Sequence, residues 1–173
     1  MNAVTHPRTA PVWLTWIIIS LFLFLSACAS TPSRNKRPSK TPQNVSVGAG
    51  PNRALAVYAM KFLGTPYKYG GSHPSNGFDC SGLVQYSAKN SLNLNLPRRS
   101  VDQGDHGKSI SLNKAQAGDL LFFNTDGQPY SHVGIYVGQT YFIHAPSSGG
   151  EVRIEDYSKT YWTQRFTSAR RVQ

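Results

Sequence analysis

The stretch GFDCSG, residues 77–82, places one cysteine between an aspartate and a serine in a run of small polar residues. A structural cysteine usually has apolar neighbours and is deeply buried. Asp79 is instead a good helix N-cap, and the residues after it predict a helix over residues 80–90. Cys80 then occupies the first helical position, where free N–H groups and the helix dipole favour a thiolate and can stabilise an oxyanion. A small residue packed at a helix start remains the alternative unless other residues support catalysis.

The N-terminus has the features of a bacterial export signal. Residues 12–25, VWLTWIIISLFLFL, form an apolar run that is shorter than the roughly 20 residues of a membrane-spanning helix. The sequence LSAC, residues 25–28, resembles the lipobox of bacterial lipoproteins. This resemblance predicts a signal peptide over residues 1–27 and a lipid on Cys28. An ordinary signal peptide cut near Ala27 and an uncleaved anchor are the alternatives.

Two residues near this cleavage point bear on localisation and redox state. Ala29 stands where an aspartate would signal retention in the inner membrane of a Gram-negative cell. The resemblance to lipoproteins therefore predicts anchoring in the outer membrane, facing the periplasm. Once Cys28 carries lipid, Cys80 has no partner in the chain, although structural cysteines in oxidising compartments are usually paired. An unpaired cysteine there indicates a reactive thiol or an intermolecular bridge.

Composition divides the rest of the chain into a linker and one domain. Residues 28–51 hold Pro, Ser, Gly, Asn and basic residues and almost no large apolar side chains, which predicts a flexible, lipid-bearing linker. Residues 52–173 then form a single domain. The formal net charge is +10, and four linker residues contribute to it without nearby acids: Arg34, Lys36, Arg37 and Lys40. A basic linker suits an anionic membrane or cell wall, or is simply solvated. The sequence contains no nucleic-acid-binding motif, and an export signal argues against a nucleic-acid partner.

Within the domain, patterns typical of helices come before patterns typical of strands. Residues 52–64 predict a helix with Asn52 as N-cap and Gly64 as the stop, and residues 96–103 predict a loop that enters a short helical turn. Runs of β-branched and aromatic residues predict strands at 118–123, 132–138, 141–145 and 151–155, with a helical turn and a last strand in 161–172. This order predicts an α+β fold in which N-terminal helices pack on one antiparallel β-sheet.

Four histidines lie in the predicted domain. His73 and His106 fall in loops, and we expect both at the surface. His132 opens one predicted strand and His144 closes the next, so a hairpin brings both to the same end of the ladder. A two-residue loop beginning at Gly138 would place their side chains on opposite faces, because strand side chains alternate. We therefore predict an odd-numbered loop or a β-bulge at that glycine. A regular hairpin with one merely structural histidine is the alternative.

Cys80, His132 and His144 together suit the chemistry of a thiol hydrolase. In this interpretation His132 takes the proton of the Cys80 thiol and His144 orients the His132 imidazole, with Asp79 as the rival orienting residue. One cysteine and two histidines can also hold zinc with an open water site. This second interpretation is less favoured, because zinc sites usually draw two ligands from one short motif together with a carboxylate base, and the sequence has no HExxH-like pair.

Motifs spread along the domain resemble those of one known family. GTPYKYGG, GFDCSGLVQY, LPRRSVDQ, GDLLFF, SHVGIYVG and FIHA occur in the order found in the NlpC/P60 family of bacterial cell-wall peptidases. The likeness extends from residue 52 to residue 172, and the small lipoprotein members of Gram-negative bacteria are the most similar group. It implies a compact papain-like fold of the α+β class.

The resemblance also implies roles for individual residues. Cys80 matches the family's nucleophile, His132 its base and His144 the third, orienting residue. Tyr67 matches a tyrosine whose hydroxyl contributes to the oxyanion site, and Tyr69 is the alternative for that role.

Further positions match the surroundings of the family's nucleophile and its substrate groove. Asp79 and Ser81 flank the cysteine, and Arg98 and Gln103 correspond to positions near the groove. We expect these four residues at the substrate-binding site. Arg99 departs from the family pattern, in which a small hydroxyl residue is common at this position. It is either a determinant of substrate preference or a solvated arginine.

The function implied by the resemblance is that of a lipid-anchored cysteine endopeptidase acting on peptidoglycan stem peptides. The family cuts bonds next to diaminopimelate or D-amino acids, which leaves γ-D-glutamyl–diaminopimelate and the D-alanyl–diaminopimelate cross-link as candidates. The lipoprotein likeness slightly favours the cross-link. We expect no metal or other cofactor, a monomer, and the membrane as a partner through the lipid alone. A non-catalytic peptidoglycan-binding scaffold, or an amidase or acyltransferase, is the alternative.

Overall fold

The computed structural model describes residues 45–147 and 150–173. The predicted signal peptide, the predicted lipidation site Cys28 and most of the predicted linker lie outside the described residues. Within the described part of the chain, no helix combines the length and the hydropathy needed to cross a membrane.

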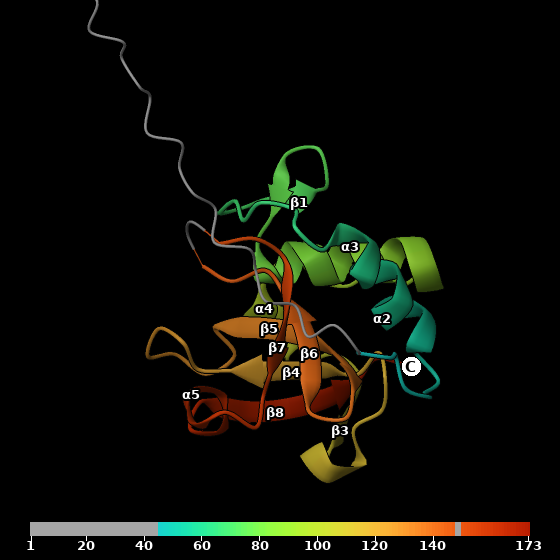
Figure 1. Ribbon diagram of the computed structural model, residues 1–173, viewed down its shortest axis with the longest axis vertical. Helices are drawn as coiled ribbons and strands as arrows, with labels where there is room; N and C mark the ends of the chain where they lie inside the picture. Colours follow the sequence, from blue (N-terminus) through green and yellow to red (C-terminus); the bar gives the residue numbers. More distant parts are fainter. Residues whose placement is uncertain (1–44, 148–149) are drawn as a thin grey trace, which may run out of the picture. The chain divides into compact units, whose positions relative to one another are not determined.

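A six-stranded antiparallel sheet forms the centre of the fold, with the strand order β3-β8-β4-β5-β6-β7 (Figure 1). Its strands are β3 (Lys108–Ile110), β4 (Leu120–Phe123), β5 (His132–Gly138), β6 (Tyr141–His144), β7 (Arg153–Asp156) and β8 (Phe166–Arg171). The four strands predicted between residues 118 and 155 and the last strand are confirmed. The short edge strand β3 was not predicted.

Most helical segments precede the six-stranded sheet in the chain and two short ones lie between its strands, which confirms the predicted α+β class. The helical segments are α2 (Arg53–Ala59), the 3-10 turn η1 (Met60–Phe62), α3 (Cys80–Leu92), α4 (Ser100–Gln103), the 3-10 turn η2 (Leu112–Lys114) and α5 (Thr160–Thr163). His73, which we expected in a loop, lies instead in the two-residue ladder of β1 (Ser72–His73) with β2 (Gly77–Phe78). Helices α2 and α3 lie together on one side of the sheet (Figure 1).

Side chains on the two faces of the sheet pack into two separate hydrophobic cores. Val133, Ile135 and Val137 of β5 pack with residues of α2 and α3, including Leu55 and Leu83. Side chains of opposite parity form a second cluster under α5: Leu121, Phe123, Tyr136, Phe142, Trp162 and Ala169. Because both faces of the central strands are buried, a one-residue change of register would move each set of side chains into the other core, where the packing does not match it.

The start of α2 differs from the prediction. Asn52 stands at the N-cap position, but its side chain makes no capping hydrogen bond and is fully buried. It packs against Gly118, where a Cβ atom would collide with the Asn52 carbonyl oxygen. The first turn is held by backbone hydrogen bonds instead, Leu55 N–H to Asn52 O at 2.9 Å and Arg53 N–H to Gly50 O at 3.2 Å. Gly64, with φ +81°, ends the helical segment as predicted.

The folded domain begins before residue 52. Val45 and Val47 pack against the core formed with α2 and α3. Gly48 N–H donates to Val137 O at 2.8 Å, and Ala117 N–H donates to Ala49 O at 3.1 Å. Residues 45–51, which the composition assigned to the linker, are therefore part of the domain.

Strands β5 and β6 contain the predicted β-bulge. Ile135 pairs with Ile143 and Tyr136 with Phe142, but the next pair is Gly138 with Tyr141, so Val137 is the extra residue. Gly138 has φ +134°, a conformation that residues with a side chain rarely adopt. The turn itself lies at residues 139–140, one position later than a loop beginning at the glycine.

Candidate active site

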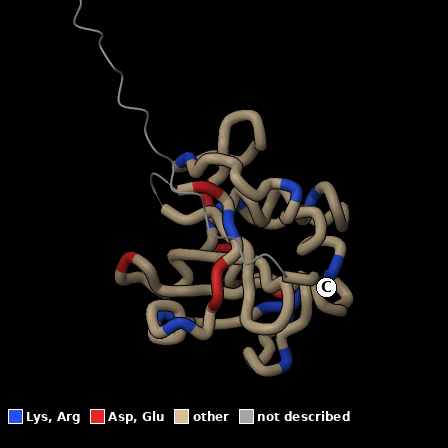
Figure 2. The backbone as a smooth tube through the Cα atoms, viewed as in Figure 1, with Lys and Arg blue, Asp and Glu red and all other residues tan. Residues whose placement is uncertain are grey.

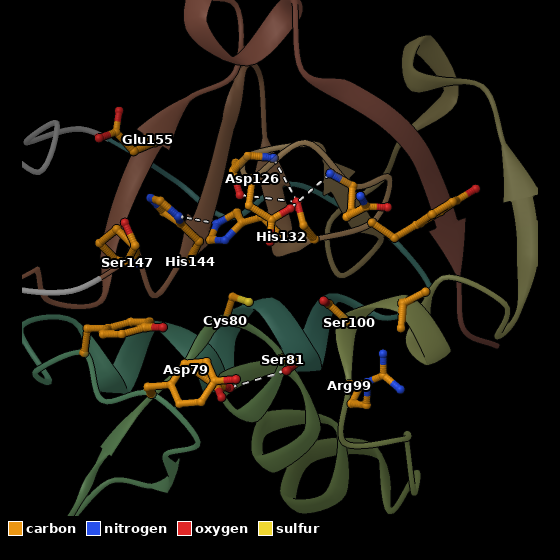
Figure 3. Close-up of a pocket in the computed structure, with 18 of the residues that line it drawn as sticks. Asp79, Cys80, Ser81, Arg99, Ser100, Asp126, His132, His144, Ser147 and Glu155 are labelled. Atoms are coloured by element: carbon orange, nitrogen blue, oxygen red, sulfur yellow. Dashed lines mark hydrogen bonds between the residues drawn. The ribbon is translucent and has the colours of Figure 1, made fainter.

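Cys80 is the first residue of α3, and Asp79 caps this helix as predicted. The Asp79 Oδ1 atom accepts a hydrogen bond from Gly82 N–H at 2.7 Å. The cysteine opens onto a cleft of about 1100 Å³, whose lining also includes Tyr67, His132 and His144. Figure 3 shows Cys80 on the helical wall, facing the two histidines on the sheet wall.

The two histidines are hydrogen bonded to each other. His132 Nε2 lies 2.8 Å from His144 Nδ1, and both side chains are almost fully buried. The bulge explains this contact, because continuing the β5–β6 register places His144 opposite Gly134, on the same face as His132. Gly134 presents no side chain on that face, so the two imidazoles meet across it.

The hydrogen bond between the histidines admits two neutral arrangements. If His132 donates from Nε2, its Nδ1 carries a lone pair and can accept a proton, and the His144 proton lies on Nε2. If His144 donates from Nδ1, the His132 proton lies on Nδ1, and that nitrogen cannot act as a base. In either case His144 Nε2 is buried without a hydrogen-bond partner among the described residues. Only the first arrangement lets His132 act as a base toward a neighbouring thiol.

Burial keeps the resting groups neutral. It lowers the pKa of His132 to about 4, with a smaller contribution from the Arg153 charge. The pKa of His144 is lowered well below its usual value, chiefly by burial and then by His132. Burial also raises the pKa of the Cys80 thiol, although a backbone N–H bond from Val133 opposes the shift. At neutral pH the site therefore holds a thiol beside a neutral imidazole pair.

Asp79 and Arg98, both expected at the substrate site, form a close ion pair. Arg98 Nη1 lies 2.9 Å from Asp79 Oδ1, and Arg98 Nη2 lies 2.6 Å from Asp79 Oδ2. The same guanidinium donates to Ser81 Oγ at 2.9 Å and to Gly71 O at 3.3 Å. All three side chains line the cleft, but their polar groups are engaged with one another. They hold the start of α3 in place.

Gln103 does not lie at the cleft. Its side chain is fully buried, and Nε2 donates to Ser81 O at 3.0 Å and to Pro97 O at 2.8 Å. The substrate-binding position expected from the resemblance is thus corrected, because both of these hydrogen bonds tie α4 and its preceding loop to α3. His73 and His106 are exposed, as predicted.

Tyr67 and Tyr69 both line the cleft, but they differ in exposure. Tyr67 is half-buried, whereas Tyr69 is 89% exposed. The Tyr67 backbone N–H donates to Gly150 O at 2.8 Å. Tyr67 also forms an isolated parallel β-bridge with Phe78, which lies just before α3. Burial, followed by the charges of Cys80 and Asp79, raises the pKa of the Tyr67 hydroxyl, which therefore keeps its proton at neutral pH. The structure favours Tyr67 over Tyr69 as a hydrogen-bond donor close to the cysteine.

Sequence reasoning missed the aromatic surroundings of the histidine pair. The Trp162 ring stacks on His132 with centroids 5.8 Å apart and meets His144 edge-on at 5.2 Å. Trp162 belongs to the tail that resembles the family, but no local pattern indicates which residue it contacts. Arg153, which pairs with His144 across β6 and β7, was missed for the same reason.

No three His, Cys, Asp or Glu side chains within residues 45–147 and 150–173 are placed to share one metal ion. The two imidazoles are hydrogen bonded to each other through His132 Nε2 and His144 Nδ1. The geometry therefore favours the thiol interpretation over the zinc interpretation.

An antiparallel sheet with a buried histidine pair, facing a cysteine at a helix N-terminus, defines the papain-like α+β class. A model of the NlpC/P60 family matches residues 64–171. The chain is 40% identical over 116 residues to the murein DD-endopeptidase MepH of Escherichia coli, covering 65% of this chain and 43% of that protein. It is 36% identical over 165 residues to a probable endopeptidase of Haemophilus influenzae, covering 93% of this chain and 99% of that protein.

Solved structures agree with these relatives. The NlpC/P60 domain of the peptidoglycan hydrolase SagA superposes with a TM-score of 0.60 at 37% identity, covering 68% of this chain and 96% of that one. An NlpC/P60 family protein from Bacillus cereus gives a TM-score of 0.65 at 30% identity, covering 75% of this chain and 42% of that one. The chain belongs to the NlpC/P60 family. This confirms the recognition from the sequence motifs, including assignment to a family of enzymes that hydrolyse peptidoglycan.

Proposed function

We propose that this protein is a cysteine endopeptidase that hydrolyses amide bonds in the stem peptides of peptidoglycan. The observation that carries the proposal is the 2.8 Å bond between His132 and His144 on the cleft wall that faces Cys80. A buried histidine pair has little structural value, because it leaves His144 Nε2 without a partner among the described residues. It is useful as a base with a fixed orientation.

The residues divide the reaction between them. His132 Nδ1 accepts the thiol proton as Cys80 Sγ attacks the amide carbonyl, and His144 Nδ1 accepts the hydrogen bond from the imidazolium. Backbone N–H groups at the start of α3 and the Tyr67 hydroxyl stabilise the oxyanion. His132 then passes the proton to the leaving amine, which gives a thioester. Water, activated by the same imidazole, releases the acid and restores the thiol.

The neutral resting state bears on how the thiol is activated. Because burial disfavours both the thiolate and the imidazolium, the thiol keeps its proton in the resting enzyme. The attack is therefore assisted by a general base and does not start from a preformed ion pair.

We also propose the cellular setting from the sequence. The lipobox-like LSAC and the following Ala29 support lipidation at Cys28 and attachment to the outer membrane, facing the periplasm. The relatives named as murein endopeptidases support the D-alanyl–diaminopimelate cross-link as the scissile bond, with γ-D-glutamyl–diaminopimelate as the other candidate.

Digestion of purified sacculi, with products identified by mass, tests the function and the bond together. Loss of cross-linked dimers with a gain of monomers establishes a cross-link endopeptidase. Shortened stems move the cut to the γ-glutamyl bond. Sacculi that bind the protein but yield no new product contradict the peptidase proposal and favour a scaffold.

A further inference from the structure

The charged groups that line the cleft are almost all paired. Arg98 forms an ion pair with Asp79 at 2.6 Å. Glu155 forms ion pairs with both Arg153, at 2.9 Å, and Lys159, at 3.4 Å. Arg98 and Asp79 cancel each other's charge, whereas Arg153 and Lys159 share the one carboxylate of Glu155.

Arg99 is the exception among the cationic residues of the cleft. Its side chain is exposed and lines the cleft, and it forms no hydrogen bond or ion pair with residues 45–147 or 150–173. Asp126 is the remaining acid of the lining, and it lies on the opposite wall, where its Oδ1 accepts a bond from Gln128 N–H at 3.1 Å (Figure 3). Among the described residues, the wall that carries Cys80 thus presents one guanidinium without a hydrogen-bond or ion-pair partner.

The backbone under Arg99 is well fixed. Its carbonyl accepts a hydrogen bond from Gln103 N–H at 3.0 Å, at the start of α4. Its neighbour Arg98 is held by the cap of the helix that begins with Cys80. A guanidinium on this support needs to order only its own side chain to bind a ligand, which lowers the entropic cost of binding.

We propose that Arg99 is a specificity-determining residue that binds a free carboxylate of the substrate, the one on the diaminopimelate side chain. This inference rests on the proposed function. Diaminopimelate is common to both candidate scissile bonds, and its carboxylate matches the planar donor fork of a guanidinium. Arg99 also departs from the small hydroxyl residue common in the family, so this preference belongs to the present chain.

The test measures binding without turnover. The full chain carrying Cys80→Ala, purified in detergent, is titrated with two synthetic stem tetrapeptides. One contains diaminopimelate with its free side-chain carboxylate, and the other carries a carboxamide there. We expect the carboxylate peptide to bind about tenfold more tightly, and Arg99→Ala to reduce this preference to less than about twofold. Arg99→Lys should restore part of the preference, because it keeps the charge but loses the fork.

Lys159→Ala is the matched control, because it removes a cleft-lining cation that is already paired with Glu155. It should leave the preference unchanged. Equal binding of the two peptides, or an equal loss of preference in Arg99→Ala and Lys159→Ala, would overturn the inference. If the preference is seen but the wild-type chain hydrolyses neither peptide nor sacculi, the inference on Arg99 stands and the proposed peptidase function fails.

Discussion

The protonation state of Cys80 follows from its position at a half-buried helix start that lines the cleft. The helix dipole and backbone N–H groups favour a thiolate, as the sequence predicted, but burial is the larger effect and raises the thiol pKa. The sequence identified the stabilising groups correctly. It could not predict the net direction, because burial depends on how the sheet packs over the cysteine.

Alkylation of Cys80 tests this balance. Since burial raises the thiol pKa above its ordinary value of 9.0, the rate with iodoacetamide should stay low at pH 7 and rise only at strongly alkaline pH. His132→Gln should not lower that alkaline rate. A fast, pH-independent reaction down to pH 5, lost in His132→Gln, would indicate a preformed ion pair and contradict the account.

The buried histidines should also couple stability to pH. A histidine has a pKa of 6.5 when exposed, and His132 falls to about 4 in the folded chain, so the unfolded state binds more protons between these values. Stability is therefore complete above pH 6.5 and declines as the pH falls toward 4. His132 alone accounts for about 3 kcal/mol of this loss.

Urea unfolding at several pH values measures the effect. His132→Gln should make the curve shallower between pH 6.5 and 4, with the contribution of His144 remaining, whereas the exposed His73→Gln should leave it unchanged. Identical curves for the wild-type chain and His132→Gln would show that the imidazole is not buried in its neutral form.

At the scale of elements, the local patterns were the more reliable guides. The cap at Asp79 and the helix after it were predictable, because a capping hydrogen bond joins residues three apart. The β-bulge could be predicted from parity once both histidines were assigned to one site. The short strand β3 (Lys108–Ile110) and the buried side chain of Asn52 depend on distant partners, which no local pattern reveals.

Gly138→Ala tests the bulge. The φ angle of +134° disfavours any side chain, and a Cβ atom would lie 3.1 Å from Gly48 N. We expect the free energy of unfolding to fall by about 1–3 kcal/mol, together with a loss of activity as the histidine pair shifts. Gly48→Ala is the control, because its Cβ would meet only ordinary contacts at 3.7 Å. Equal stability of the two variants would show that the bulge does not need the glycine.

At the scale of the whole molecule, two cores share one sheet, and the site lies where the sheet meets the start of α3. The sequence predicted the α+β class from the order of its helix and strand patterns, and it predicted Cys80, His132 and His144 from residue chemistry and the family motifs. It did not predict the burial of Gln103 or the pairing of Asp79 with Arg98, because matching positions in a family do not reveal which side chains contact each other.

Lys and Arg are spread over the described part of the chain, and acidic residues are fewer (Figure 2).

The segment before α2 should contribute to the stability of the whole domain. A chain beginning at residue 45 keeps the packing of Val45 and Val47 and the hydrogen bonds of residues 48–49, whereas a chain beginning at residue 52 loses them. We expect the shorter chain to be less stable by about 2–4 kcal/mol in urea unfolding. Equal stability of the two chains would show that residues 45–51 do not stabilise the domain and belong to the linker, as the composition first suggested.

The central claim is that Cys80 is the nucleophile of a peptidoglycan peptidase. The most direct measurement compares the release of muropeptides from sacculi by the full chain and by Cys80→Ala, with circular dichroism to verify that both are folded. The account predicts release by the wild-type chain and a loss of about a thousandfold or more in the variant. Release of the same products by folded Cys80→Ala at a similar rate would contradict it.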